Sequence, residues 1–230
     1  YSGFSADALK NRIEDAAAKI VICSNSYPYG KKTVESIKNV FEALKENKVV
    51  EHVIIVQRLK TTLDVGSSKL DNEDRSLKLE NQTSNFQPPN QTSNLKYPTS
   101  KFIWWYDLMA KQSAVCPTEI MESSDPAFIL YTSGTTGKPK GIIHGHGGYM
   151  VGIYATLKFV FDIKPDDIFW STADAGWITG HSYILYSPLI NGITTFVYEG
   201  TPDYPDIEIW WKLIDKHKVT KFYTAPTAIR

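Results

Sequence analysis

The chain has 230 residues, 42% of them hydrophobic, which is enough for one large globular domain or two small ones. Lysine plus arginine and aspartate plus glutamate number 25 each, so no basic excess favours nucleic acid and no polybasic block favours a membrane surface. No apolar stretch approaches the roughly 20 residues of a membrane helix, and Cys23 and Cys116 are too few for a disulfide framework. We expect a cytoplasmic, reducing setting. Because the chain starts at Tyr1 without methionine and stops at Arg230, we also expect a piece of a longer protein.

The first 56 residues alternate between helix and short apolar strand. Apolar residues recur every three or four positions after Ser5, a predicted N-cap, and a buried strand is expected at 20–23. A second helix is predicted directly behind Thr33, before a strand at 53–56. This alternation predicts a parallel sheet covered by helices on both faces.

Residues 60–100 interrupt the alternation. They are rich in Asn, Gln, Ser, Thr and Lys, and the string NQTSN occurs at 81–85 and again at 90–94. With few large apolar side chains to bury, the tract is predicted to be an exposed, disordered insertion.

Beyond the insertion, the alternation of strand and helix resumes. Apolar residues 102–105 and a strand at 127–130 come first, and a helix is expected from about 150 to 161, its first turn following Gly147 and Gly148. The remaining predicted elements are a strand at 168–171, a helix at about 177–189, a strand at 193–198, a helix around 207–214 and a strand at 219–223. The fold class is therefore α/β: an open, doubly wound, largely parallel sheet flanked by helices, with ligands bound beyond the carboxyl ends of the strands.

A glycine-, hydroxyl- and lysine-rich loop follows the strand at 127–130. Its sequence, YTSGTTGKPKG at 131–141, combines three glycines, four Thr or Ser hydroxyls and two lysines, which suits a polyphosphate. It is not a Walker loop, because two residues separate Gly134 from Gly137 and Pro139 replaces the magnesium-binding hydroxyl. A helix start nearby is expected to add positive charge; a polar linker is the alternative. The predicted phosphate-binding residues are Thr132, Ser133, Gly134, Thr135, Thr136, Gly137, Lys138, Lys140 and Gly141.

This loop resembles the signature loop of the adenylate-forming, AMP-binding enzymes, a family of acyl-CoA synthetases, luciferases and peptide-synthetase adenylation domains. The block STADAGWITGHSY at 171–183, Glu199 with Gly200, and YTAPTAIR at 223–230 are similar to the acetyl-CoA synthetases of that family. The resemblance implies that residues 1–230 are part of the large N-terminal AMP-binding domain. The adenine-binding motifs and the mobile C-terminal lid domain would follow Arg230, so residues 1–230 alone are expected not to turn over.

The resemblance also implies a reaction. ATP and acetate would give acetyl-adenylate and pyrophosphate, and coenzyme A would then give acetyl-CoA and AMP. Thr132, Lys138 and Lys140 are the implied catalytic residues. Mg²⁺ would accompany ATP, with its protein ligand beyond Arg230, so no metal ligand is assigned in this chain. Partners would be the small molecules acetate, ATP and coenzyme A, with the oligomeric state left open.

The resemblance assigns an acyl pocket to Trp177, Ile178 and Thr179. Propionate-specific relatives tend to carry valine at the position of Thr179, so threonine favours acetate, although one side chain discriminates by only about 1–3 kcal/mol. A propionate or other short-chain acyl-CoA ligase is therefore the alternative enzyme. The alternative from another class is a truncated nucleotide-binding or interaction module that catalyses nothing.

For coenzyme A, the resemblance implies contacts from both halves of the chain. They are Gly3, Tyr29, Gly30, Lys31, Lys32, Thr179 and Asp203. Tyr29 departs from the usual arginine, and Asp203 departs from the usual asparagine, with a carboxylate that cannot donate a hydrogen bond to a phosphate. His144 and His146 have a spacing sometimes used for metals, but hydrogen bonds at a helix start are expected for both.

Overall fold

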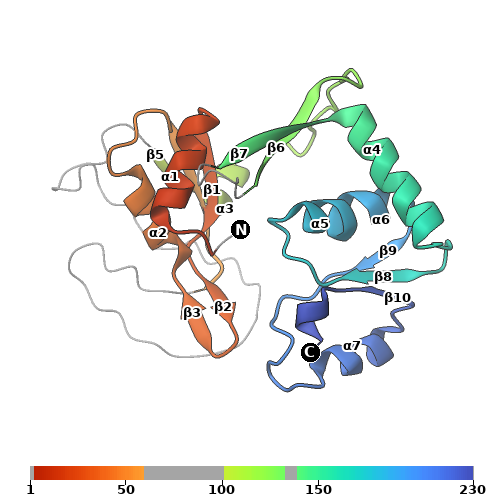
Figure 1. Ribbon diagram of the computed structural model, residues 1–230. Helices are drawn as coiled ribbons and strands as arrows, with labels where there is room; N and C mark the ends of the chain where they lie inside the picture. Colours follow the sequence, from red (N-terminus) through yellow and green to blue (C-terminus); the bar gives the residue numbers. More distant parts are fainter. Residues whose placement is uncertain (1–2, 60–100, 133–138, 230) are drawn as a thin grey trace.

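The computed structural model describes residues 3–59, 101–132 and 139–229 (Figure 1). Within them lie two three-stranded parallel sheets with flanking helices and two antiparallel hairpins. The predicted α/β class is confirmed, with the parallel strands divided between two sheets. The predictions for residues 60–100 lie outside the described residues.

The first sheet has the order β1-β4-β5. Its elements are α1 (Ala6–Asp15), β1 (Ile20–Ser24), α2 (Ser36–Leu44), β4 (His52–Val56), β5 (Lys101–Trp104) and α3 (Trp105–Met109). Ser5 caps α1 as predicted, because its Oγ accepts the Ala8 N–H at 3.2 Å. Ile37 of α2 and Val53 of β4 are fully buried in the core.

The prediction that β1 is buried was only half right. Val21 and Cys23 pack against the core, whereas Ile20 and Ile22 are 55% and 60% exposed. Successive side chains of a strand point to opposite faces, so only every second residue of β1 reaches the core under the helices.

A hairpin, which the sequence did not predict, precedes α2. Strands β2 (Tyr27–Tyr29) and β3 (Lys32–Val34) pair antiparallel. The predicted second helix is therefore present, but it begins at Ser36 and not directly behind Thr33. Gly30, at φ 58, supplies the left-handed backbone that this two-residue turn needs.

A second hairpin carries the glycine-rich loop. Strand β6 (Pro126–Thr132) pairs antiparallel with β7 (Lys140–Gly145), a strand that the sequence did not predict. Helix α4 (His146–Ala155) continues as a π-helical turn over Thr156–Val160. Because β7 separates them, α4 begins six residues, or about 20 Å of strand, away from Lys140. The prediction that a helix start adds positive charge beside the loop is therefore wrong.

The second sheet has the order β10-β8-β9 and is covered on both faces. Its strands are β8 (Ile168–Ser171), β9 (Thr194–Phe196) and β10 (Lys221–Tyr223); its helices are α5 (Ile178–Gly180), a π-helical turn at His181–Tyr186, α6 (Ser187–Ile190) and α7 (Ile209–His217). Phe169 packs edge-on against Phe161 on one face, and Trp170 packs against Trp210 of α7 on the other. The prediction of a doubly covered sheet is confirmed here.

A buried carboxylate joins two strands of this sheet. Asp167, 8% exposed, accepts hydrogen bonds from Thr220 Oγ1 at 2.6 Å and from the Lys164 N–H at 2.7 Å. Burial raises the pKa of Asp167, but these hydrogen bonds and the charges of Lys164 and Lys221 outweigh it, so the net shift of the pKa is downward.

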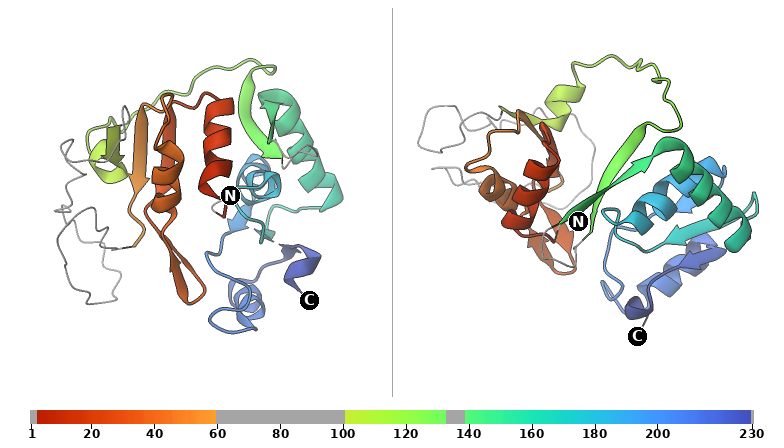
Figure 2. Two further views of the ribbon diagram at one scale, coloured as in Figure 1. Left: turned by 60° about the vertical axis from the view of Figure 1, so that its left-hand side comes forward. Right: turned by 45° about the horizontal axis from the view of Figure 1, so that its top comes forward.

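The two sheets lie on opposite sides of the β6–β7 hairpin, which runs from α1 toward α4 (Figure 2). None of the helices in the described ranges is both long enough and apolar enough to cross a membrane.

Candidate active site

The ends of the β6–β7 hairpin frame the predicted phosphate loop. Thr132, the last residue of β6, pairs with Lys140, the first residue of β7, and both are exposed. A Cβ atom on Gly141 would lie 3.2 Å from the Tyr131 ring and 2.9 Å from Ile129 Cγ2, so glycine lets that ring lie over the strand. Residues 133–138, including Lys138, lie outside the described residues. The predicted roles of all these residues stay predictions.

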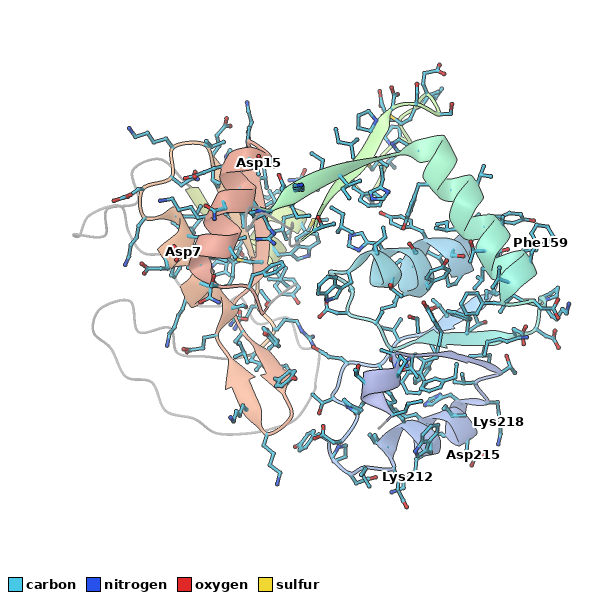
Figure 3. All side chains as sticks on the ribbon, viewed as in Figure 1. Asp7, Asp15, Phe159, Lys212, Asp215 and Lys218 are labelled. Carbon is cyan, nitrogen blue, oxygen red and sulfur yellow. The ribbon has the colours of Figure 1, made fainter. Side chains whose placement is uncertain are left out.

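Tyr131 holds the hairpin against α1. Its hydroxyl donates to Asp15 Oδ2 at 2.6 Å, and the Arg12 guanidinium lies 5.7 Å from the centre of its ring. Burial, the hydrogen bond to Asp15 and the charge of Asp15 raise the pKa of Tyr131 to about 12. The hydroxyl therefore stays protonated and keeps donating at neutral pH. Figure 3 shows Asp15 on α1 beside the hairpin.

The predicted acyl segment begins at the carboxyl end of β8. The Thr172 N–H donates to Tyr223 O at 3.0 Å, and the two threonine Oγ1 atoms of Thr172 and Thr224 are 2.6 Å apart. Asp174 then closes a turn, because its Oδ1 accepts the Gly176 N–H at 2.7 Å. These contacts join the ends of β8 and β10, where a doubly wound sheet binds ligands.

Gly180 sets the position of the helix that follows the Asp174 turn. Trp177, half-exposed, Ile178 and Thr179 form the helix start, and Gly180 in its first turn is buried. A Cβ atom on Gly180 would lie 2.0 Å from Asp174 O. The helix therefore lies directly on the backbone of the preceding turn.

An aromatic cluster joins the hairpin to this helix. Phe128 of β6 stacks on His144 at 4.7 Å and lies 4.9 Å from the Tyr149 ring and 5.4 Å from the His181 ring. The Tyr149 hydroxyl and Ser182 Oγ are 2.9 Å apart. The structure thus brings the predicted phosphate hairpin and the predicted acyl segment together through Phe128 and Tyr149. Apart from an apolar pattern, nothing in the sequence indicated these contacts of Phe128 and Tyr149.

The two histidines of the His-x-His pattern differ from expectation. His144 lies in the middle of a hairpin, where its ring stacks on Phe128, so a helix-start hydrogen bond is wrong for it. His146 does begin α4, but it is its backbone N–H that donates to Asp125 O, at 3.0 Å.

Two of the predicted coenzyme A segments lie side by side. A Cβ atom on Gly30 would be 3.9 Å from Thr201 Oγ1, which places the tip of the β2–β3 hairpin beside the segment that contains Asp203. Tyr29, Lys31, Lys32 and Asp203 are exposed there. Gly3 lies exposed just before the Ser5 cap, and Thr179 lies on the helix after β8. Ligand contacts of all these residues stay predictions.

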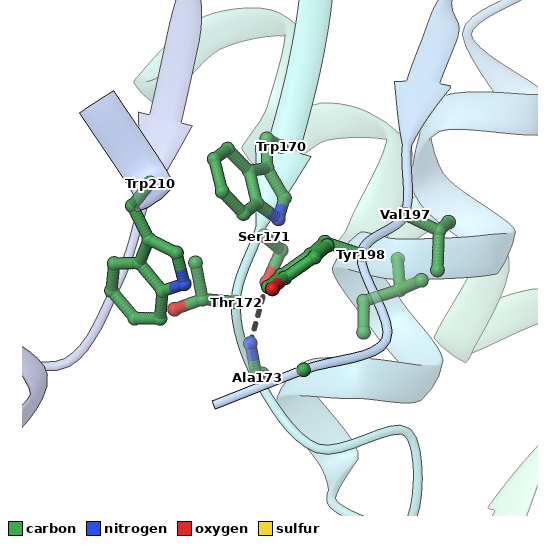
Figure 4. A pocket seen from close by; sticks show the side chains of 9 residues that line it. Trp170, Ser171, Thr172, Ala173, Val197, Tyr198 and Trp210 are labelled. Carbon is green, nitrogen blue, oxygen red and sulfur yellow. Dashed lines mark hydrogen bonds between the residues drawn. The ribbon is translucent and has the colours of Figure 1, made fainter. Parts of the chain in front are cut away.

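A small cavity opens at the carboxyl ends of β8 and β9 (Figure 4). Its volume of about 40 Å³ has room for water only. It is lined by Trp170, Ser171, Thr172, Ala173, Ile184, Val197, Tyr198, Gly200 and Trp210. The Nε1–H of Trp210 is buried without a partner, which suits an ordered water. The cavity is far too small for a nucleotide.

No three His, Cys, Asp or Glu side chains lie together as a metal site in the described ranges. The assignment of Mg²⁺ to the nucleotide stays a prediction.

The chain belongs to the AMP-binding enzyme family, whose sequence profile matches residues 1–230. It is 44% identical to the acetyl-coenzyme A synthetases of Pasteurella multocida (strain Pm70) and Chromobacterium violaceum, over 231 and 232 residues. To that of Methanothrix thermoacetophila it is 43% identical over 230 residues. Each match covers 100% of this chain but only 30%, 31% and 30% of the relative, so the chain spans less than a third of their length.

The fold is also found in a solved structure, acetoacetyl-CoA synthetase from Streptomyces lividans. The two superpose with a TM-score of 0.73 over 98% of this chain and 29% of that one, at 23% identity. The likeness supports the α/β fold described above.

Proposed function

We propose that this chain forms part of the active site of an AMP-forming acetate–CoA ligase. The observation that carries the proposal is its similarity, along its whole length and at 44% identity, to proteins named acetyl-coenzyme A synthetase. The glycine- and lysine-rich loop at 131–141 supports it, because such a loop suits a polyphosphate and no Walker geometry is present.

In the first step, an oxygen of the acetate carboxylate forms a bond to the α-phosphorus of ATP, and the bond from that phosphorus to the bridging oxygen breaks. Pyrophosphate leaves with the electron pair, so no proton has to be removed by the protein. The contribution of the chain is to hold the β- and γ-phosphates through loop N–H groups, Thr132, Lys138 and Lys140, and so to stabilise the charge that develops on pyrophosphate.

In the second step, the thiol sulfur of coenzyme A forms a bond to the carbonyl carbon of the acetyl-adenylate, and the bond from that carbon to the phosphate oxygen of AMP breaks. AMP leaves with the electron pair, and the thiol proton passes to water. The surface proposed for coenzyme A is the tip of the β2–β3 hairpin with the segment from Thr201 to Asp203, where Lys31 and Lys32 offer positive charge to the nucleotide phosphates. Trp177, Ile178 and Thr179, at the carboxyl end of β8, form the wall for the acyl group.

Exchange of labelled pyrophosphate into ATP, measured with the full-length protein, tests the proposal. We expect acetate to support exchange well above the reaction without acid, and better than propionate by about 10-fold or more. Thr179→Val is expected to shift that ratio toward propionate. Residues 1–230 alone are expected to be inactive. Exchange that no short acid stimulates would refute the proposed function, while a preference for propionate would leave an acyl-CoA ligase of different specificity.

A further inference from the structure

An ion pair connects the two sheets close to the proposed coenzyme A surface. Arg58, just after β4 of the first sheet, pairs through its guanidinium with the carboxylate of Glu199, which follows β9 of the second sheet. Both side chains are half-exposed, and exposed pairs add little to global stability. A role for this pair must therefore come from what it positions.

Arg58 and the β2–β3 hairpin share one buried anchor. Asn25, 2% exposed, accepts the N–H groups of Ser26 and Arg58 at 2.8 Å each through its Oδ1, and its Nδ2 donates to Leu59 O at 2.8 Å. The hairpin starts at Tyr27, directly beyond this anchor. The backbone of Arg58 is thus fixed relative to the root of the hairpin.

On the other sheet, Glu199 lies in a closed loop. The Tyr198 hydroxyl donates to Tyr204 O at 3.0 Å, so the residues between them form one compact turn. Thr201 of this turn is the residue that lies beside Gly30, at the hairpin tip. Holding Glu199 therefore holds the turn against the hairpin.

We propose that Arg58 and Glu199 are positioning residues that fix the hairpin tip at Gly30 against the segment 200–203, and so shape the surface for coenzyme A. The inference rests on the proposed function, which assigns coenzyme A to that surface. Neither side chain touches the reacting atoms. Loss of the pair weakens coenzyme A binding, and adenylate formation, which precedes coenzyme A, changes little.

The test measures coenzyme A affinity by calorimetry on the full-length protein, beside acetate-dependent pyrophosphate exchange without coenzyme A. Arg58→Gln and Glu199→Gln are each expected to raise the Kd for coenzyme A about 5-fold, while exchange changes less than about twofold. The exchanged pair R58E/E199R is expected to bring the Kd back to within about twofold of wild type.

The control is Lys19→Gln. Lys19 pairs with Glu51 at 3.4 Å, is likewise exposed, and lies at the opposite end of the same parallel strands. The Lys19→Gln variant loses one positive charge, as Arg58→Gln does, and should leave the Kd for coenzyme A unchanged.

Three results would overturn the inference. Tighter binding in Glu199→Gln would mean that Arg58, once released, contacts a phosphate directly. An unchanged Kd in both single variants, or an exchanged pair as weak as the single ones, would remove the positioning role. A wild type without pyrophosphate exchange would instead count against the proposed function, and the calorimetric result would still decide the role of the pair.

Discussion

Replacing Gly180 by alanine should destabilise the protein more than its small size suggests. The new Cβ atom would lie 2.0 Å from Asp174 O and 2.7 Å from Ala175 Cα, and both are backbone atoms. Real Cβ contacts almost never fall below 3.0 Å, so the helix start must move by about 1 Å from the turn before it. Ser182 and Ile184, which are buried in the helical turn that follows Gly180, resist this movement.

The magnitude follows from two opposing terms. Overpacking a core costs about 1–3 kcal/mol, and a clash with backbone places Gly180→Ala at the upper end of this range. Alanine in a helix regains roughly 0.5–1 kcal/mol relative to glycine. We therefore expect a net loss of about 2 kcal/mol in the free energy of unfolding, which lowers the urea midpoint by about 1 M.

Urea unfolding followed by tryptophan fluorescence measures this loss, with Gly152→Ala as the matched control. Gly152 is a helical glycine of α4, and a Cβ atom there would meet nothing within 4 Å. Gly152→Ala should therefore raise the free energy of unfolding by roughly 0.5–1 kcal/mol. Equal midpoints for the two variants would refute the close approach of the helix to Asp174. Because Trp177 to Thr179 precede Gly180, the proposed acyl pocket predicts that Gly180→Ala in the full-length protein also lowers the ratio of acetate-dependent to propionate-dependent pyrophosphate exchange.

Three further predictions concern single side chains. Burial raises the pKa of the Cys23 thiol to about 12, so a thiol reagent at neutral pH should label exposed Cys116 alone in the native protein; equal labelling rates would contradict this. Asp167→Asn should cost about 1–2 kcal/mol in the free energy of unfolding at pH 7. Because the pKa of Asp167 is lower in the folded state, that difference should shrink as the pH falls below about 4, and a difference that grew in acid would reverse the sign. Lys140→Ala should slow pyrophosphate exchange about 100-fold with protein stability unchanged, and wild-type exchange would exclude Lys140 from the phosphate site.

Strong local patterns in the sequence were enough to predict many of the elements. The Ser5 cap, the strands at 53–56 and 168–171, and the helix that starts after Trp177 follow from apolar periodicity and capping chemistry within a few residues. The phosphate loop was recognised for the same reason, since its glycines, hydroxyls and lysines are adjacent in the chain.

Both hairpins escaped prediction, because antiparallel pairing depends on a partner strand. The six residues of β7 have no clear alternation, and β3 was read as the start of a helix. Missing β7 also placed the start of α4 beside the loop, on the wrong end of the hairpin.

The sequence by itself determined the family, the α/β class and the residues that suit a polyphosphate, because these depend on residue types at short spacing. Only the tertiary structure decided which of them meet. The ring of Phe128, on the β6–β7 hairpin, contacts the ring of His181. Gly30 lies beside Thr201, and Arg58 pairs with Glu199, which is 141 positions away in the sequence. Such contacts join different sheets, and no local propensity carries information about a partner that the chain reaches only when it folds.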